Sequence, residues 1–399
     1  MKILNHIFTF VTIIFALTGC NKNADLDNEV IVQLDPNSKY IHFVADVSTR
    51  GALVEGENLE DNFLTLGYQY RGNWETAKVL ATPNVFDSTP ELVSYNAGIF
   101  TYEDIQTWTG STYSFFGYYP SNNSYIKLFD NNSVKTGDPY ITYNFPTDSD
   151  PTLHIDIMTA SYIDTGAASS SNVQMQFHHR LCAVDVGARN YYTLDHDNDT
   201  STPDKEVTIE LTGLYVALTN IVNTSAKIYL DHSIPTEYPS AQTRASVNYV
   251  MVGSPTWAPT TFDVQPNTSS DRAIRLVTHT TGQNASSLMF IPQKELVSGS
   301  VDIYYRKKYV ADNGKTLYQR INLGNNGETS YTWTELPTDE NALQYYTFKP
   351  TLNINFDKPL VEGRRYYIEL TFTSDVVSVN IVAAEEWNTL PDNISYDFE

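Results

Sequence analysis

Cysteine is almost absent from this chain, whose 399 residues include only Cys20 and Cys182. A small domain held together by several disulfides is therefore excluded, because two cysteines can form at most one pair. Basic residues are also scarce, with 25 Lys and Arg against 47 Asp and Glu and a formal net charge of −22. This charge disfavours nucleic acids and anionic surfaces as partners, so we expect no nucleic-acid binding.

Catalytic and cofactor motifs are missing as well. The sequence has no Gly-x-Ser-x-Gly elbow, no His-Glu-x-x-His, no phosphate loop and no Gly-x-Gly-x-x-Gly. Two pairs of adjacent residues, His178–His179 and Glu385–Glu386, lie in strand-like runs, where neighbours point to opposite faces and cannot readily act together. We therefore predict that the protein is not an enzyme and needs no cofactor. A hydrolase with carboxylates from distant strands is the weakest alternative.

Long hydrophobic runs are lacking too, and the longest apolar segment lies at the N-terminus. It extends from Ile7 to Leu17 and follows Lys2, whereas a membrane span needs roughly 20 apolar residues. The sequence Leu17-Thr18-Gly19-Cys20 is typical of a bacterial lipobox after an export signal. We expect residues 1–19 to be removed and Cys20 to carry lipid, including palmitate. A plain signal peptide with an incidental cysteine is the alternative.

What the chain does contain is a series of short alternating runs of apolar and polar residues, with the period of two typical of half-buried strands. The clearest runs lie at 41–47, 173–177, 207–211, 301–305 and 366–372. The 28 tyrosines add strand propensity. Turn-forming Gly, Pro, Asn and Asp separate the runs. The pattern predicts an all-β fold made of sandwiches rather than a parallel α/β sheet.

The length of the chain exceeds what one hydrophobic core usually supports, which predicts two domains. The boundary is expected where the run at 181–184 gives way to the polar loop at 195–200. The expected division is a signal peptide at 1–19, a linker at 20–38, an N-terminal sandwich at 39–188 and a C-terminal sandwich at 189–399.

The polar loop offers a weak metal candidate. Asp195, Asp197, Asp199 and Glu206 have the spacing of calcium ligands at positions 1, 3, 5 and 12 of an EF-hand loop. Position 6, however, is Thr200 instead of the glycine that the sharp turn requires, and the flanking runs are strands instead of helices. A solvated loop between domains is the favoured interpretation, so no metal site is predicted.

The tryptophans suggest a second function, because exposed aromatic rings can stack on sugars. Large aromatics in a β protein more often fill the core. A surface glycan-binding lipoprotein is therefore kept as the alternative function. The candidate residues are Trp74, Trp108, Trp257, Trp333 and Trp387.

A series of short motifs follows the lipobox in a defined order over nearly the whole mature chain. They are Ser48-Thr49-Arg50, Leu66-Gly67-Tyr68, Phe116-Gly117-Tyr118-Tyr119-Pro120, Phe177-His178-His179-Arg180-Leu181, Phe290-Ile291-Pro292-Gln293, Glu362-Gly363-Arg364-Arg365-Tyr366-Tyr367 and Glu386-Trp387. In this order the motifs resemble the fimbrillin-like (Mfa-like) proteins of Bacteroidetes.

The resemblance implies two transthyretin-like β-sandwich domains in a lipoprotein exported to the outer membrane. Family members that serve as fimbrial subunits are cut after an arginine and lose their lipid and first strand. A strand from the next subunit then fills the groove that opens. By this resemblance Arg50 is the processing site, and the segment from Cys20 to Arg50 is lost. An ordinary turn arginine is the alternative.

Two runs of this sequence have the apolar faces that such an exchange needs. The strand to be displaced would present Ile41, Phe43, Ala45 and Val47 on one face. The candidate donor strand near the C-terminus would present Val377, Val379, Ile381 and Ala383. Alternation does not say which chain a strand joins, so the second run is equally compatible with the last strand of its own domain.

The resemblance, together with the lipobox, therefore implies a fimbrial subunit or adhesin-type lipoprotein of the cell surface and fimbrium. Its expected partners are other fimbrial subunits or copies of itself, the outer membrane through the lipid anchor, and a host receptor or glycan. A stalk, tip or anchor role is open.

Overall fold

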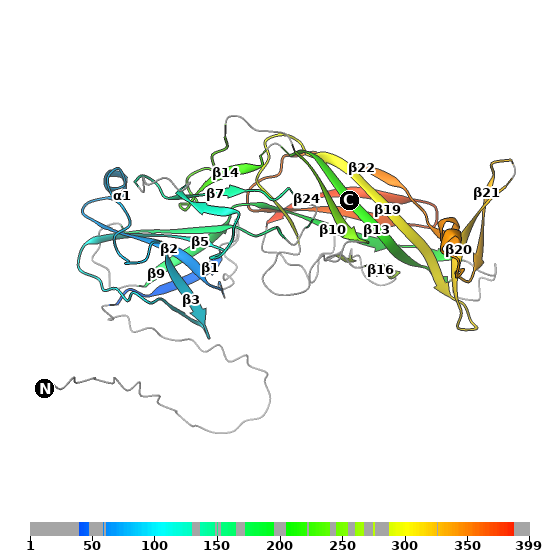
Figure 1. The fold of residues 1–399 in the computed structure, drawn as a ribbon, viewed down its shortest axis with the longest axis horizontal. Coiled ribbons are helices and arrows are strands. Elements are labelled where there is room, and N and C mark those ends of the chain that lie inside the picture. The colour runs from blue at the N-terminus through cyan, green and yellow to red at the C-terminus, as the bar shows by residue number, and fades with distance from the viewer. Residues whose placement is uncertain are drawn as a thin grey trace, which may run out of the picture. The chain divides into compact units, whose positions relative to one another are not determined.

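The computed structural model describes residues 40–47, 59, 61–129, 136–147, 150, 153–164, 172–194, 205–221, 223–239, 245–253, 260–266, 274–275, 287–324 and 326–386. Strands dominate these residues, which confirms the predicted all-β fold (Figure 1). Two short helices interrupt them, α1 at Trp74–Ala77 and the 3₁₀ helix η3 at Glu340–Tyr346. No helix in this part of the chain is both long and apolar enough to cross a membrane.

The first sheet contains seven strands of the described N-terminal residues, in the order β1-β9-β8-β5-β2-β3-β4. All neighbours are antiparallel except β1 and β9, which run parallel. Its strands are β1 (Phe43–Val47), β9 (Val173–His179), β8 (Met158–Ile163), β5 (Thr112–Tyr119), β2 (Phe63–Tyr70), β3 (Glu91–Asn96) and β4 (Ile99–Thr101).

Both faces of this sheet are covered. Phe63 and Phe115 join Phe43 in one hydrophobic cluster, whereas Leu66 and Phe116, which lie on the opposite face of β2 and β5, belong to a second cluster. A three-stranded sheet contributes to that second cluster. It consists of β6 (Ile126–Leu128), β7 (Tyr140–Asn144) and β14 (Ser225–Tyr229).

Two further sheets are formed mainly by C-terminal residues. One contains β10 (Cys182–Asn190), β17 (Ile274–Arg275), β18 (Leu288–Phe290), β23 (Arg364–Phe372) and β24 (Val377–Glu386). The other contains β13 (Thr208–Ile221), β15 (Ala245–Val252), β16 (Phe262–Val264), β19 (Ser298–Val310), β20 (Thr316–Leu323), β21 (Thr329–Thr334) and β22 (Thr351–Asn355). Buried residues of both sheets, such as Ile368 and Val301, belong to one core cluster.

The strand partners change between β9 and β10. The boundary expected at residue 188 falls inside β10, whose partners β17, β18 and β23 all lie later in the chain. β14 then returns to pair with β7 of the N-terminal part. The division into two sandwich domains remains a prediction.

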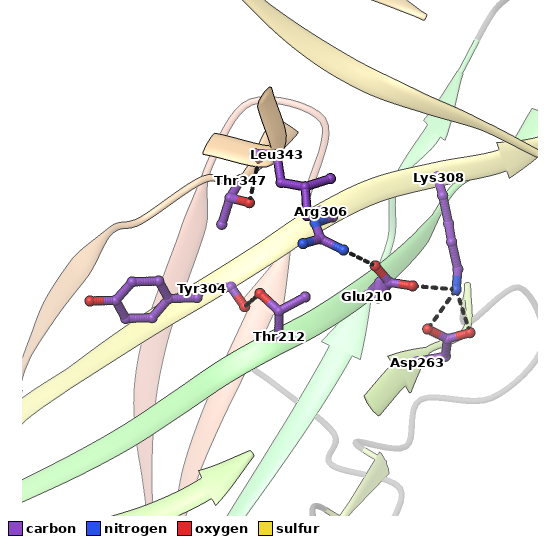
Figure 2. Close-up of polar contacts among 8 residues, drawn as sticks. All are labelled: Glu210, Thr212, Asp263, Tyr304, Arg306, Lys308, Leu343 and Thr347. Atoms are coloured by element: carbon purple, nitrogen blue, oxygen red, sulfur yellow. Dashed lines mark hydrogen bonds and ion pairs between the residues drawn. The ribbon is translucent and has the colours of Figure 1, made fainter. Parts of the chain in front are cut away.

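The outward face of the β13–β19 pair is held by charged side chains (Figure 2). Arg306 and Lys308 of β19 both donate to the carboxylate of Glu210 on β13, at 3.2 and 3.0 Å. Lys308 also pairs with Asp263 of β16 at 2.7 Å. The alternation along β19 puts these residues outward and leaves Lys307, between them, facing the interior.

Candidate assembly site at two edge strands

β1 is the first strand of its sheet and pairs only with β9 among the named strands (Figure 1). The parallel register runs from Phe43 opposite Val173 to Val47 opposite Phe177. An edge strand can leave its sheet with the loss of a single ladder of hydrogen bonds, whereas a central strand would break two.

Most of one face of β1, together with Ile41 just before it, is buried. Ile41 is 1% exposed, Phe43 2% and Ala45 1%, whereas His42 and Val44 on the opposite face are half-buried. Val47 packs against the same cluster from a partly buried position. The apolar face of the strand is therefore embedded in the protein.

Phe43 is the centre of an aromatic cluster. Its ring meets the edges or faces of Phe115, Tyr102 and Phe63 at centroid distances of 5.4, 5.5 and 6.0 Å. Phe86 lies 6.5 Å away. Aromatic pairs at these distances stabilise beyond the area that they bury, so Phe43 is the main anchor of β1.

Polar contacts hold β1 on the side away from β9. The Ile41 amide donates to the Gln106 carbonyl at 2.9 Å, and the Tyr102 hydroxyl donates to the Ile41 carbonyl at 2.7 Å. Burial raises the pKa of Tyr102 to about 12, so this hydroxyl stays protonated and can donate. At the other end the Leu59 amide donates to the Ala45 carbonyl at 3.3 Å. Leu59 thus lies against the edge of β1 that faces away from β9.

Two side chains of β9, Met175 and Phe177, lie over Gly117 of β5 on the same face of the sheet. A Cβ atom at Gly117 would lie 2.8 Å from the Met175 methyl carbon and 3.2 Å from the Phe177 ring. Glycine at this position therefore leaves room for these two side chains on the face of the sheet. Met175 and Phe177 are fully buried, as are Phe63 and Phe115, and the apolar face of β1 packs against these four side chains.

β24 is an edge strand of another sheet and pairs with β23 in antiparallel register. Val377, Val379 and Ile381 are half-buried and pack against the core, whereas Ser378 and Asn380 are exposed. Ala383 lies in the same strand. The candidate donor residues thus belong to the last strand of this chain's own sheet.

A buried lysine anchors the turn between β23 and β24. The Lys307 ammonium donates to the Ser374 carbonyl at 2.9 Å and lies 4.7 and 4.9 Å from the ring centres of Tyr192 and Phe348. Burial lowers the pKa of Lys307 to about 8. Lys307 is not among the predicted site residues, although its inward position follows from the alternation along β19.

The comparisons with known proteins agree with this architecture. A model of the fimbrillin-like family matches residues 72–387. The chain belongs to the fimbrillin-like family. The predicted resemblance is thereby confirmed.

Solved structures resemble this fimbrillin-like chain over most of its length. A fimbrial protein from Bacteroides vulgatus has 17% identity and a TM-score of 0.53, and the match covers 87% of this chain and 99% of that one. The fimbrial anchor protein Mfa2 from Porphyromonas gingivalis has 8% identity and a TM-score of 0.30, with 87% and 98% covered. The first likeness shows a shared fold. A search of curated proteins found no match.

Several predicted positions of this fimbrillin-like chain lie outside the described residues. These are Cys20, Arg50, Asp195, Asp197 and Asp199. Glu206, the fourth candidate calcium ligand, is exposed in β12 (Lys205–Glu206), which pairs with β11 (Thr193–Leu194). Among the described residues no group of three or more His, Cys, Asp or Glu could hold a metal ion.

The adjacent histidines have different neighbours. His179 lies 2.7 Å from the Asp156 carboxylate, whereas the His178 ring stacks on His232 with centroids 3.6 Å apart. The structure therefore does not bring His178 and His179 together.

The tryptophans that the structure describes do not form an exposed platform. Trp74 is buried, and Trp108 and Trp333 are half-buried. Trp257 and Trp387 lie outside the described residues. The geometry of the described tryptophans therefore favours packing over sugar stacking.

Proposed function

We propose that this chain is a fimbrial subunit or adhesin of the cell surface that joins other subunits by exchange of an edge strand. Its family membership and its fold, shared with a fimbrial protein, support a structural role without catalysis. Lipid on Cys20 would anchor the precursor in the outer membrane. Cleavage after Arg50 would then free the segment that contains β1.

The observation that carries this proposal is the position of β1. An edge strand whose Phe43 and Ala45 are buried closes a groove that its departure would open. The loss would expose the rings around Phe43 and the apolar residues of β9, and would leave one ladder of backbone groups without partners. Such a groove would bind an extended segment that restores the apolar packing and the backbone hydrogen bonds.

A cut after Arg50 would fall between β1 and the next described residue, Leu59. Val47 ends β1 and Leu59 returns to its edge, with Arg50 between them in the sequence. A cut there would break the covalent link between β1 and the later strands without cutting a described strand. The candidate donor, β24, would have to leave β23 and the anchor at Lys307 before it could reach another subunit.

Limited proteolysis tests the proposal. The purified full chain is treated with an arginine-specific protease, and mass and oligomer size are followed together. We expect a cut after Arg50, loss of the N-terminal segment and growth of oligomers that resist denaturant. Arg50→Gln should prevent all three.

Arg71→Gln is the matched control, because Arg71 is exposed in the turn after β2. This variant should be cut at Arg50 and should polymerise normally. A cut that yields only stable monomers, or a monomer that retains the β1 peptide, would rule out strand exchange at β1.

A further inference from the structure

A cavity of about 500 Å³ opens among four segments that are distant in sequence. Arg180 follows β9, residues 232–238 follow β14, residues 292–294 follow β18 and residues 360–362 precede β23. Small-molecule sites in proteins have volumes of roughly 300 to 1,000 Å³. The cavity is therefore large enough for a small ligand, and none of its lining residues belongs to β1 or β24.

The inner wall is fixed by a buried ion pair. The Arg180 side chain is fully buried, and its Nε lies 2.9 Å from Glu362 Oε1. Its other nitrogens donate to the carbonyls of Tyr229 and Ile234, at 3.0 and 3.2 Å. Thr236 links the two ends of this network, because its hydroxyl accepts from Arg180 and donates to Glu362. A wall held in this way needs little ordering when a ligand binds.

The cavity carries one positive charge that no described carboxylate compensates. Its lining residues with fixed charges at neutral pH are Arg180, Glu362 and Lys294. The first two neutralise each other, whereas Lys294 is exposed and makes no ion pair within the described part of the chain. In a protein of net charge −22, this local cation favours a ligand with a negative group.

Apolar and aromatic surface lies beside that charge. The Lys294 ammonium is 5.3 Å from the centre of the Tyr238 ring, and Pro235 and Pro292 also line the cavity. Tyr238 is half-buried and packs against the core, which fixes its ring. Burial raises the pKa of Tyr238 to about 12, so its hydroxyl remains a hydrogen-bond donor at neutral pH.

We propose that this cavity binds an acidic monosaccharide unit, with the sugar carboxylate on Lys294 and the sugar ring against Tyr238 and the two prolines. A pyranose ring has an apolar C–H face and a polar rim, and the cavity offers both kinds of surface within a short distance of the cation. Uronic acids and sialic acids share this chemistry. The inference does not depend on strand exchange at β1.

Calorimetric titration of the purified full chain tests this inference with four probes. D-glucuronate and N-acetylneuraminate represent the two sources of acidic sugar, D-glucose is the neutral match and acetate is the carboxylate without a ring. We expect one or both acidic sugars to bind at least about tenfold more tightly than glucose and acetate, since a charge-assisted hydrogen bond and the ring contacts are both required.

Two variants locate the site. Lys294→Met keeps the aliphatic stem and removes the charge, so it should weaken acidic-sugar binding by about tenfold or more. Lys349→Met is the matched control, because Lys349 is also exposed and lies 5.6 Å from the ring centre of Tyr304, outside the cavity. It should leave binding unchanged.

Four outcomes would overturn the inference. They are no binding of either acidic sugar at millimolar concentration, glucose binding as tight as that of the acidic sugars, acetate binding as tight as that of the acidic sugars, and equal losses in the two lysine variants. Tyr238→Ala provides a second test of the site, and unchanged binding in this variant would exclude the ring contact.

Discussion

Replacing Phe43 with alanine tests how firmly β1 is held. The side chain is 2% exposed, and four aromatic rings surround it at 5.4 to 6.5 Å. Truncation of a buried phenylalanine typically costs about 3–5 kcal/mol, because transfer free energy is lost and a cavity remains. We expect a loss of about 4 kcal/mol in the free energy of unfolding of the N-terminal region, measured by urea denaturation.

Val44→Ala is the matched control on the same strand. Val44 is half-buried on the opposite face, so its truncation should cost about 1 kcal/mol or less. After cleavage at Arg50, the Phe43→Ala fragment should also leave the protein faster than the wild-type fragment. The reasoning is refuted if Phe43→Ala costs less than about 1 kcal/mol, or if Val44→Ala costs as much.

Three further predictions concern residues away from β1. Burial lowers the pKa of His154 from 6.5 to about 4, so the folded state resists protonation of this histidine. The free energy of unfolding should therefore fall by about 2–3 kcal/mol from pH 7 to pH 4.5. His154→Phe should reduce this loss, measured by urea titrations at the two pH values. Burial lowers the pKa of Lys307 from 10.5 to about 8, so this lysine loses its proton in the folded state while it stays protonated in the unfolded chain. The free energy of unfolding should therefore rise with pH by about 2 kcal/mol up to pH 9.5. Lys307→Met should remove this rise in the same assay. A Cβ at Gly299 would lie 1.9 Å from the Ala217 carbonyl oxygen. Gly299→Ala should therefore cost at least about 2 kcal/mol of stability, measured by thermal unfolding. An unchanged melting temperature would contradict the close approach of β13 and β19.

Local pattern predicted much of the strand structure. The alternation at 41–47 corresponds to β1, and the alternation at 301–305 falls within β19. It also gives the inward side of each strand, since Val301, Ile303 and Tyr305 are buried while Tyr304 and Arg306 are half-buried. These features depend on residues close in sequence, which a period of two describes directly.

Pairing between distant strands could not be predicted in the same way. β10 pairs with β23 from the C-terminal part of the chain, and β14 pairs with β7 from the N-terminal part. A period of two gives the buried face of a strand and not its partner. The parallel pairing of β1 with β9 spans about 130 residues and depends on the whole fold.

The candidate sites needed side chains from several segments at once. The cavity beside Lys294 combines residues between Arg180 and Glu362, and Tyr238 comes from the chain between β14 and β15. Arg180 lies in one of the motifs that carried the family resemblance, but its fully buried position could not be inferred from charge and composition. Its burial is possible because the fold supplies an acceptor for each end of the guanidinium.

The two edge strands differ in a way that gives proteolysis a physical role in the proposed exchange. β1 presents Phe43 to a cluster of aromatic rings, whereas the residues of β24 that pack against the core are Val377, Val379 and Ile381. An aliphatic side chain at the Phe43 position would fill less of the cluster and would lose its ring–ring contacts. A strand such as β24 could not displace an intact β1 by its own affinity, because β1 packs better and competes from within the same chain at high effective concentration. A cut after Arg50 would remove the high effective concentration of β1, because β1 would no longer belong to the same chain as its groove. Such a cut would therefore be the step that permits exchange.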